Sequence, residues 1–146
     1  VLDEHMIKEK LEYIKHQLPK ATHYCYAYRL GNTKDVYRAN DDGEPNGTAG
    51  LPILHQIDSF GLTNILIVVT RYYGGTKLGV SGLILAYKAC AIETIQQTEI
   101  VEYTIYETIR IELTHQVANS FFNLLNQHKL RYSKDIEVEK IIFNVE

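Results

Sequence analysis

The first segment whose residues could do chemistry is DDGEPNGTAG at residues 41–50. It carries three closely spaced carboxylates, on Asp41, Asp42 and Glu44. Such carboxylates can bind a hard metal ion or act as general bases in hydrolysis. Their spacing does not match a calcium-binding loop, so we expect no metal site. The carboxylates could favour the dipole of the helix that follows, or they could form ion pairs with Arg71 and Lys77, and we favour the ion pairs.

A second glycine-rich segment, RYYGGTKLGVSG at residues 71–82, carries the cations of Arg71 and Lys77. It comes close to a phosphate-binding P-loop, but a valine stands where that motif needs its lysine, so standard ATP or NAD binding is disfavoured. A strand, a glycine loop and a helix start beside two cations could still bind an anion. Equally, the glycines could serve only tight turning and close packing.

Aromatic side chains accompany the basic loop. Tyr72 and Tyr73 could stack on an unpaired base while Arg71 or Lys77 contacts phosphate, or they could simply pack in a strand. The two loops are predicted to meet as one oppositely charged corner. The candidate binding residues of this corner are Asp41, Asp42, Gly43, Glu44, Gly47, Thr48, Gly50, Arg71, Tyr72, Tyr73, Gly74, Gly75, Lys77, Gly79 and Gly82.

No nucleophile with an evident base is found in the sequence, since Ser81 lies outside a nucleophile-elbow motif and Cys90 lies within an expected helix. We therefore expect no catalytic residues and no cofactor, and favour a non-enzymatic protein that binds RNA. Two alternatives stay open. One is a hydrolase that uses the three carboxylates, and the other is a protein-interaction module whose loops are purely structural.

The overall composition limits the classes of partner. The chain has 146 residues, 45% of them hydrophobic, and a formal net charge of -3, so RNA contact would have to come from a local basic patch. No apolar run reaches the roughly 20 residues that a membrane span needs. Two distant cysteines suit a reducing compartment, so we expect a cytoplasmic protein without a membrane partner.

Hydrophobic periodicity predicts the elements of a first α+β unit. Asp3 should cap the first helix, Thr48 the second, and Gly61 should end the second in a left-handed conformation. The run NILIVVTRY is apolar on both faces, which places it in the middle of the sheet. The expected elements are a helix over 3–18, strands over 22–30 and 36–39, a helix from 49 to 60, a strand over 64–72 and a helix over 80–97.

The remaining sequence predicts a second, smaller unit. Residues 99–112 are too long for one strand, so we expect one strand to close the first unit and another to open the second, with the division near residues 103–106. Thr114 should cap a helix over 115–128, and strands should follow over 130–136 and 139–146. This β-α-β-β unit gives domains of residues 1–104 and 105–146.

The motifs DDGEPNGTAG, LPIL and VVTRYYGGTKLGVSGLILAY closely resemble those of the YigZ/IMPACT family. The family pattern is similar to DDGEPxGTAGxPxL followed by VVTRYFGGxKLGxGGLxRAY, and the resemblance covers residues 23–97. Here Ser81 replaces a usual glycine and Leu85 a frequent arginine.

This resemblance implies an N-terminal domain like ribosomal protein S5 domain 2, followed by a ferredoxin-like domain. It also implies that the sequence lacks parts of both: a first strand, and a closing helix and strand. Bacterial members of the family have no assigned function, whereas eukaryotic relatives regulate translation under amino-acid starvation. The expected partner is therefore RNA or a ribosome-associated protein.

Overall fold

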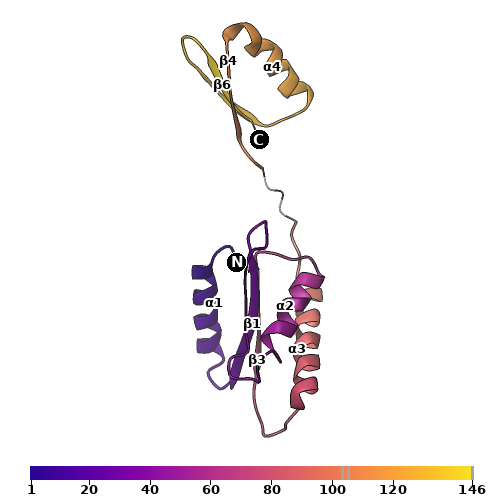
Figure 1. Cartoon of the computed structure of the whole chain (residues 1–146). Helices are drawn as coiled ribbons and strands as arrows, with labels where there is room; N and C mark the ends of the chain where they lie inside the picture. The colour runs from indigo at the N-terminus through magenta and orange to yellow at the C-terminus, as the bar shows by residue number, and fades with distance from the viewer. Residues whose placement is uncertain (103, 105, 146) are drawn as a thin grey trace. The chain divides into compact units, whose positions relative to one another are not determined.

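The computed structural model describes residues 1–102, 104 and 106–145. The chain forms two compact units, Val1–Ile100 and Val101–Glu146, and each is a mixed α and β structure with an antiparallel sheet (Figure 1). The predicted α+β class is therefore confirmed. In the described residues, every helix is too short or too polar to span a bilayer.

The sheet of the first unit has the order β2-β1-β3. Strand β1 (His23–Leu30) is central and pairs antiparallel with β2 (Val36–Asn40) and β3 (Ile65–Arg71). The prediction that the β-branched run of residues 64–72 lies in the middle of the sheet is therefore wrong. That run is apolar on both faces because helices cover both sides of β3, not because strands pair on both of its edges.

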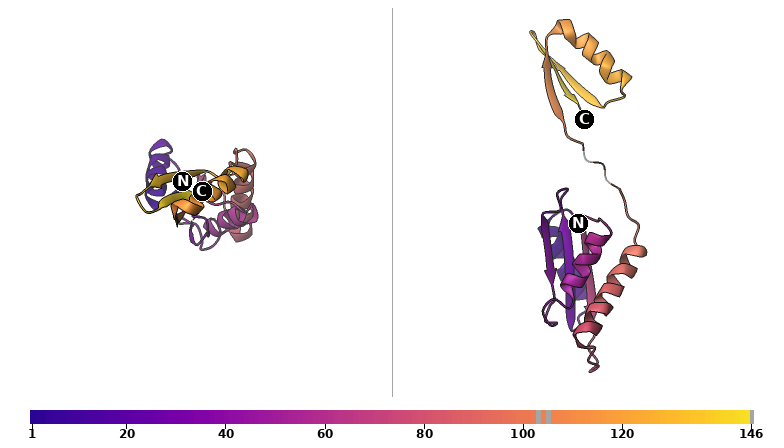
Figure 2. Two further views of the ribbon diagram at one scale, coloured as in Figure 1. Left: turned by 90° about the horizontal axis from the view of Figure 1, so that it is seen from above. Right: turned by 45° about the vertical axis from the view of Figure 1, so that its right-hand side comes forward.

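Helices cover both faces of this sheet (Figure 1 and Figure 2). Helix α1 (Glu4–Gln17) packs on one face, where Ile7 joins Tyr28 and Leu30 in a small core. Helices α2 (Gly50–Ser59) and α3 (Gly79–Gln96) cover the other face and bury a larger core. This second core contains Cys25, Ala27, Ala49, Ile53, Leu54, Ile57, Ile67, Leu83, Tyr87, Ala91 and Ile95.

Two predicted helix-end signals are confirmed. The carboxylate of Asp3 accepts a hydrogen bond from the Met6 amide at 2.7 Å and so caps α1. Helix α2 has Phe60 as its C-cap and is followed by Gly61, whose φ of 68° lies in the left-handed region. The amides of Gly61 and Leu62 donate back to the carbonyls of Asp58 and Ile57, which is the hydrogen-bond pattern of a Schellman motif.

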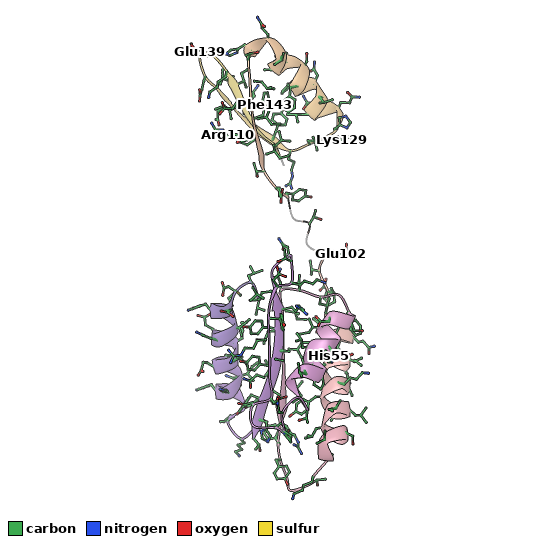
Figure 3. The ribbon with its side chains drawn as sticks, viewed as in Figure 1. His55, Glu102, Arg110, Lys129, Glu139 and Phe143 are labelled. Carbon is green, nitrogen blue, oxygen red and sulfur yellow. The ribbon has the colours of Figure 1, made fainter. Side chains whose placement is uncertain are left out.

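The second unit has the predicted β-α-β-β order. Its elements are strand β4 (Ile109–Leu113), helix α4 (His115–Gln127), strand β5 (Tyr132–Ile136) and strand β6 (Ile141–Val145). The three strands form a sheet of order β4-β6-β5, and α4 packs on one face of it. Phe143 lies between the sheet and α4, where its ring meets the edge of the Phe121 ring at 5.1 Å (Figure 3).

Two details of the second unit differ from the prediction or lie beyond it. Thr114 stands at the N-cap of α4, but its side chain makes no capping hydrogen bond. The described residues 99–102 form no strand. The rest of the strand expected to close the first unit falls partly on Tyr103 and Ile105, which lie outside the described residues.

Candidate functional site

Asp41 holds the start of helix α2. Its carboxylate accepts hydrogen bonds from the backbone amides of Gly47, Ala49 and Gly50 at 2.9, 3.0 and 2.8 Å. The first amides of a helix have no partner within the helix, and a carboxylate also suits the positive end of the helix dipole. Asp41 is thus a helix cap supplied from several residues upstream.

Thr48 was expected to cap α2 and does not. The N-cap residue is Ala49, which has no capping side chain. The buried hydroxyl of Thr48 instead donates to the carbonyl of Pro45 at 2.6 Å. Thr48 does not cap α2 because the Asp41 carboxylate already accepts hydrogen bonds from the first amides of this helix.

Asp42 ties the same loop to strand β1. Its carboxylate accepts from the Tyr24 amide at 2.7 Å, and its carbonyl lies 2.8 Å from Nδ1 of His23. The backbone of Asp42 itself has a φ of 41°, in the left-handed region that aspartate tolerates better than most residues. Asp42 therefore fastens the loop to the end of the sheet.

Gly50 is the one glycine whose missing side chain lets backbones touch. A Cβ at this position would lie 2.4 Å from the amide nitrogen of Asn40 and 2.9 Å from its carbonyl oxygen. The start of α2 therefore rests directly on the last residue of β2. Unlike Gly50, four other predicted site glycines have a positive φ: Gly43, Gly47, Gly75 and Gly79.

Glu44 is the carboxylate that reaches the basic loop. Its Oε1 accepts from Nη1 of Arg71 at 2.7 Å and from the hydroxyl of Tyr87 at 2.8 Å. Burial alone would raise the pKa of Glu44, but the hydrogen bonds from Arg71 and Tyr87 outweigh burial and hold that pKa below its ordinary value. Glu44 is therefore ionised at neutral pH.

Tyr87 and Cys25 extend this network into the core. The Cys25 sulfur lies 3.2 Å from the Tyr87 hydroxyl and 2.9 Å from the Asp41 carbonyl. Burial raises the pKa of the Cys25 thiol to about 11. Neither residue was among the predicted site residues. The apolar stripe of the helix indicates that Tyr87 faces inward, but nothing in the sequence indicates the partner of its hydroxyl.

Arg71 pairs with Glu44 and also makes contacts within its own loop. Its Nη2 donates to the Thr76 carbonyl at 3.3 Å, and its guanidinium lies over the Tyr73 ring at 5.2 Å. The Tyr73 hydroxyl donates to the carbonyl of Gly75 at 3.2 Å. The second loop is thus folded around the end of the Arg71 side chain.

The predicted corner forms only in part. Asp41 and Asp42 bind backbone amides and do not pair with the cations, contrary to the expectation. Glu44 alone pairs with Arg71. Among the residues that the structure describes, Lys77 forms no ion pair. Backbone amides and cationic side chains both donate to carboxylates. The spacing of residues in the sequence does not indicate which of these donors each carboxylate binds.

A pocket of about 320 Å³ opens where the two loops meet. Helix α3 begins with Gly79, which lines the pocket, and no side chain caps the first amides of this helix. Tyr72 is 55% exposed and does not line the pocket. The lining residues are His23, Glu44, Pro45, Arg71, Tyr73, Lys77, Leu78, Gly79, Val80 and Leu83.

Gly74 and Gly82 are not among the residues that line the pocket. A Cβ at Gly74 would meet nothing within 4 Å, so no steric reason for that glycine is found. A Cβ at Gly82 would lie 3.1 Å from that of Leu78, which makes Gly82 a packing residue of the helix start. In the described part of the chain, no group of three His, Cys, Asp or Glu side chains is placed to hold a metal ion.

Comparison with known proteins identifies the family of this chain. The model of the Impact N-terminal domain matches residues 1–95. The chain belongs to the IMPACT family. The family resemblance predicted from the two loop motifs is therefore confirmed.

Several IMPACT relatives are similar over much of this chain. IMPACT family member YvyE of Bacillus subtilis is 35% identical over 147 residues, which cover 97% of this chain and 68% of that protein. Protein IMPACT of Homo sapiens is 36% identical over 77 residues, covering 51% of this chain and 23% of that protein. The chain spans between 44% and 52% of three other bacterial relatives.

A solved structure shares the fold. It is described as "Crystal structure of an hypothetical protein" and matches with a TM-score of 0.67 and 29% identity. The match covers 94% of this chain and 68% of the solved chain.

Proposed function

We propose that this IMPACT-family chain is a non-enzymatic, cytoplasmic protein that acts with the translation machinery by binding single-stranded RNA. Its similarity to the proteins named Protein IMPACT supports a translation-related role. The RNA ligand is argued from the pocket between the two glycine-rich loops.

The carrying observation is the set of groups that this pocket brings together. Tyr73 offers an aromatic side chain, Lys77 an ammonium group, and α3 its uncapped first amides. An aromatic platform beside a cation is how many proteins hold single-stranded nucleic acid, with stacking contributing about 1–3 kcal/mol per base. Because the net charge of the chain is -3, electrostatic attraction to RNA would have to come from this local patch.

Of the two described Lys and Arg side chains that line the pocket, Lys77 is the one without an ion pair. Arg71 is held by Glu44, by the Thr76 carbonyl and by the Tyr73 ring, whereas Lys77 has no ion pair among the described residues. Each phosphate contact contributes about 0.7 to the slope of log affinity against log salt for single strands. We therefore expect modest affinity with a slope near that of one or two contacts.

The test is fluorescence polarisation of a labelled oligouridine RNA across a series of salt concentrations. Lys77→Ala should weaken binding and lower the salt slope by about 0.7, the contribution of one contact. Lys88→Ala is the matched control. Lys88 is an exposed lysine within α3, about 14 Å along the axis from Gly79, and its loss should leave both quantities unchanged.

Two results would count against RNA binding. One is no measurable affinity at low salt, and the other is an affinity that salt does not change. Equal effects of Lys77→Ala and Lys88→Ala would move the contact away from the pocket. Capture of a translation protein by a chain that binds no RNA would favour the protein-interaction alternative.

The hydrolase alternative receives less support from the site. A general base or metal centre needs carboxylates that converge on one point. Here Asp41 binds the start of α2, Asp42 binds strand β1, and Glu44 pairs with Arg71. The three carboxylates therefore serve three separate structural partners.

We also propose the finer assignment of the two units. The first would correspond to ribosomal protein S5 domain 2, with the domains divided as residues 1–104 and 105–146. The second would be ferredoxin-like, and its β-α-β-β order equals the first four elements of the β-α-β-β-α-β motif. A structural superposition of each unit by itself on those folds would test the assignment.

A further inference from the structure

The second carboxylate oxygen of Glu44 is an open acceptor at the wall of the pocket. The Glu44 side chain is only 4% exposed, and its Oε1 accepts both hydrogen bonds that this side chain makes with described residues. In the described part of the chain, no side-chain nitrogen or oxygen that is sealed from solvent lacks a partner. Oε2 is therefore not sealed from solvent, and Glu44 is one of the residues that line the pocket.

An ionised oxygen in this position calls for a hydrogen-bond donor. A carboxylate can only accept, and a largely desolvated carboxylate oxygen without a donor is costly. Arg71 and Tyr87 already occupy Oε1, so the donor for Oε2 must come from solvent or from a ligand. A ligand of this pocket that carries a hydroxyl or an N–H group would meet that need.

The rest of the pocket limits the body of such a ligand. Its walls are largely apolar, formed by Pro45, Leu78, Val80 and Leu83, and Tyr73 adds an aromatic side chain. A volume of about 320 Å³ is at the small end of the range for small-molecule sites, so it suits one monomer and not two linked ones. The ammonium of Lys77 at the rim favours a negative group.

We propose that the pocket takes a single ribonucleotide, whose ribose hydroxyl donates to Oε2 of Glu44 while its phosphate lies beside Lys77. The inference rests on the proposed RNA-binding function and names the unit that the pocket recognises. One open oxygen suits one hydroxyl, and apolar walls suit the face of any base. The pocket thereby selects ribose and tolerates different bases.

Recognition of the 2′-hydroxyl has a direct consequence, because this group is what distinguishes RNA from DNA at a single site. Acidic side chains accept from ribose hydroxyls in other nucleotide sites. Hydrogen bonds to charged groups are strong enough that loss of one lowers affinity by about tenfold or more. The chain should therefore bind RNA at least about tenfold more tightly than DNA of the same sequence.

The first experiment changes the ligand and leaves the protein intact. The polarisation titration is repeated with an oligouridine RNA, the matching 2′-deoxy strand and the 2′-O-methyl strand, all with the same label. We expect both modified strands to bind about tenfold more weakly, since each lacks the donor. Equal affinities for the three strands would overturn the ribose inference while leaving RNA binding in place.

The second experiment changes the acceptor. Glu44→Gln should bring the preference for RNA over DNA down to about one. The glutamine amide has a single acceptor oxygen, so if that oxygen pairs with Arg71, an NH₂ group takes the place of Oε2. Circular dichroism melting checks that the variant folds, and Lys88→Ala should keep the wild-type preference. A folded Glu44→Gln variant with an unchanged preference would refute the assignment to Glu44.

Competition with free nucleotides separates two sources of the same chemistry. If uridine 5′-monophosphate displaces the labelled strand and the deoxy form does so more weakly, a free ribonucleotide suffices for recognition. If only strands compete and the RNA preference holds, the recognised unit is a nucleotide within RNA. Absence of any RNA binding by the wild type would overturn the proposed function together with this inference.

Discussion

Replacing Gly50 by alanine should damage the first unit more than its small size suggests. The added Cβ would lie 2.4 Å from the Asn40 amide nitrogen, against about 3.4 Å for an ordinary contact. Both partners are backbone, so neither can rotate away. The start of α2 would have to move about 1 Å from the end of β2.

The expected cost follows from that movement. Overpacking costs about 1–3 kcal/mol. The displaced Gly50 amide would also lose its 2.8 Å hydrogen bond to the Asp41 carboxylate, which costs about 1.5–3 kcal/mol. The better helix propensity of alanine returns up to about 1 kcal/mol. We expect a net loss of about 1.5–5 kcal/mol in the free energy of unfolding.

Urea unfolding of the whole chain, followed by circular dichroism, measures this loss. The matched control is Gly74→Ala, where a Cβ meets nothing within 4 Å and the φ is not positive. That variant should stay within about 0.5 kcal/mol of the parent. If Gly50→Ala lost no more than Gly74→Ala, the direct backbone contact between α2 and β2 would be refuted.

Two further predictions concern the network around Glu44. The folded state lowers the pKa of Glu44 below its usual 4.5, so its stabilising effect is present above that value and is lost as the pH falls through the lowered pKa. The urea midpoint should therefore drop with acidification below about pH 4.5, and by less in Glu44→Gln than in the parent; an equal drop in both would contradict this. A thiol reagent at pH 8 should modify exposed Cys90 in the native chain and reach buried Cys25, with its pKa of about 11, only on unfolding. Two thiols titrated in the native state would contradict that burial.

Local signals in the sequence were sufficient for most of the helices and strands. Asp3 caps α1 and Gly61 ends α2 because each depends on neighbours within a few residues. The place of β3 was not predictable in the same way. An apolar run such as that of β3 arises from strands on both edges or from helices on both faces, and only long-range pairing distinguishes the two.

The site was predictable at the level of its loops and not of its bonds. The acidic loop does meet the basic one, but through Glu44 alone. Asp41 and Asp42 look equivalent to Glu44 in the sequence, yet backbone amides of α2 and β1 take them. The roles of Tyr87 and Cys25 depend on a strand and a helix 62 residues apart, and no spacing rule indicates such a contact.

The two loops should tolerate chain insertion very differently. In residues 41–50 the side chains of Asp41 and Asp42 accept hydrogen bonds from the backbone of α2 and β1. A residue added between them and those amides would break the hydrogen bonds that hold the helix against the sheet. At Gly74 the chain runs through open space. A peptide spliced in beside Gly74 would separate Tyr73 from Gly75 and so alter the pocket, but it would leave the hydrogen bonds of Asp41 and Asp42 to α2 and β1 in place.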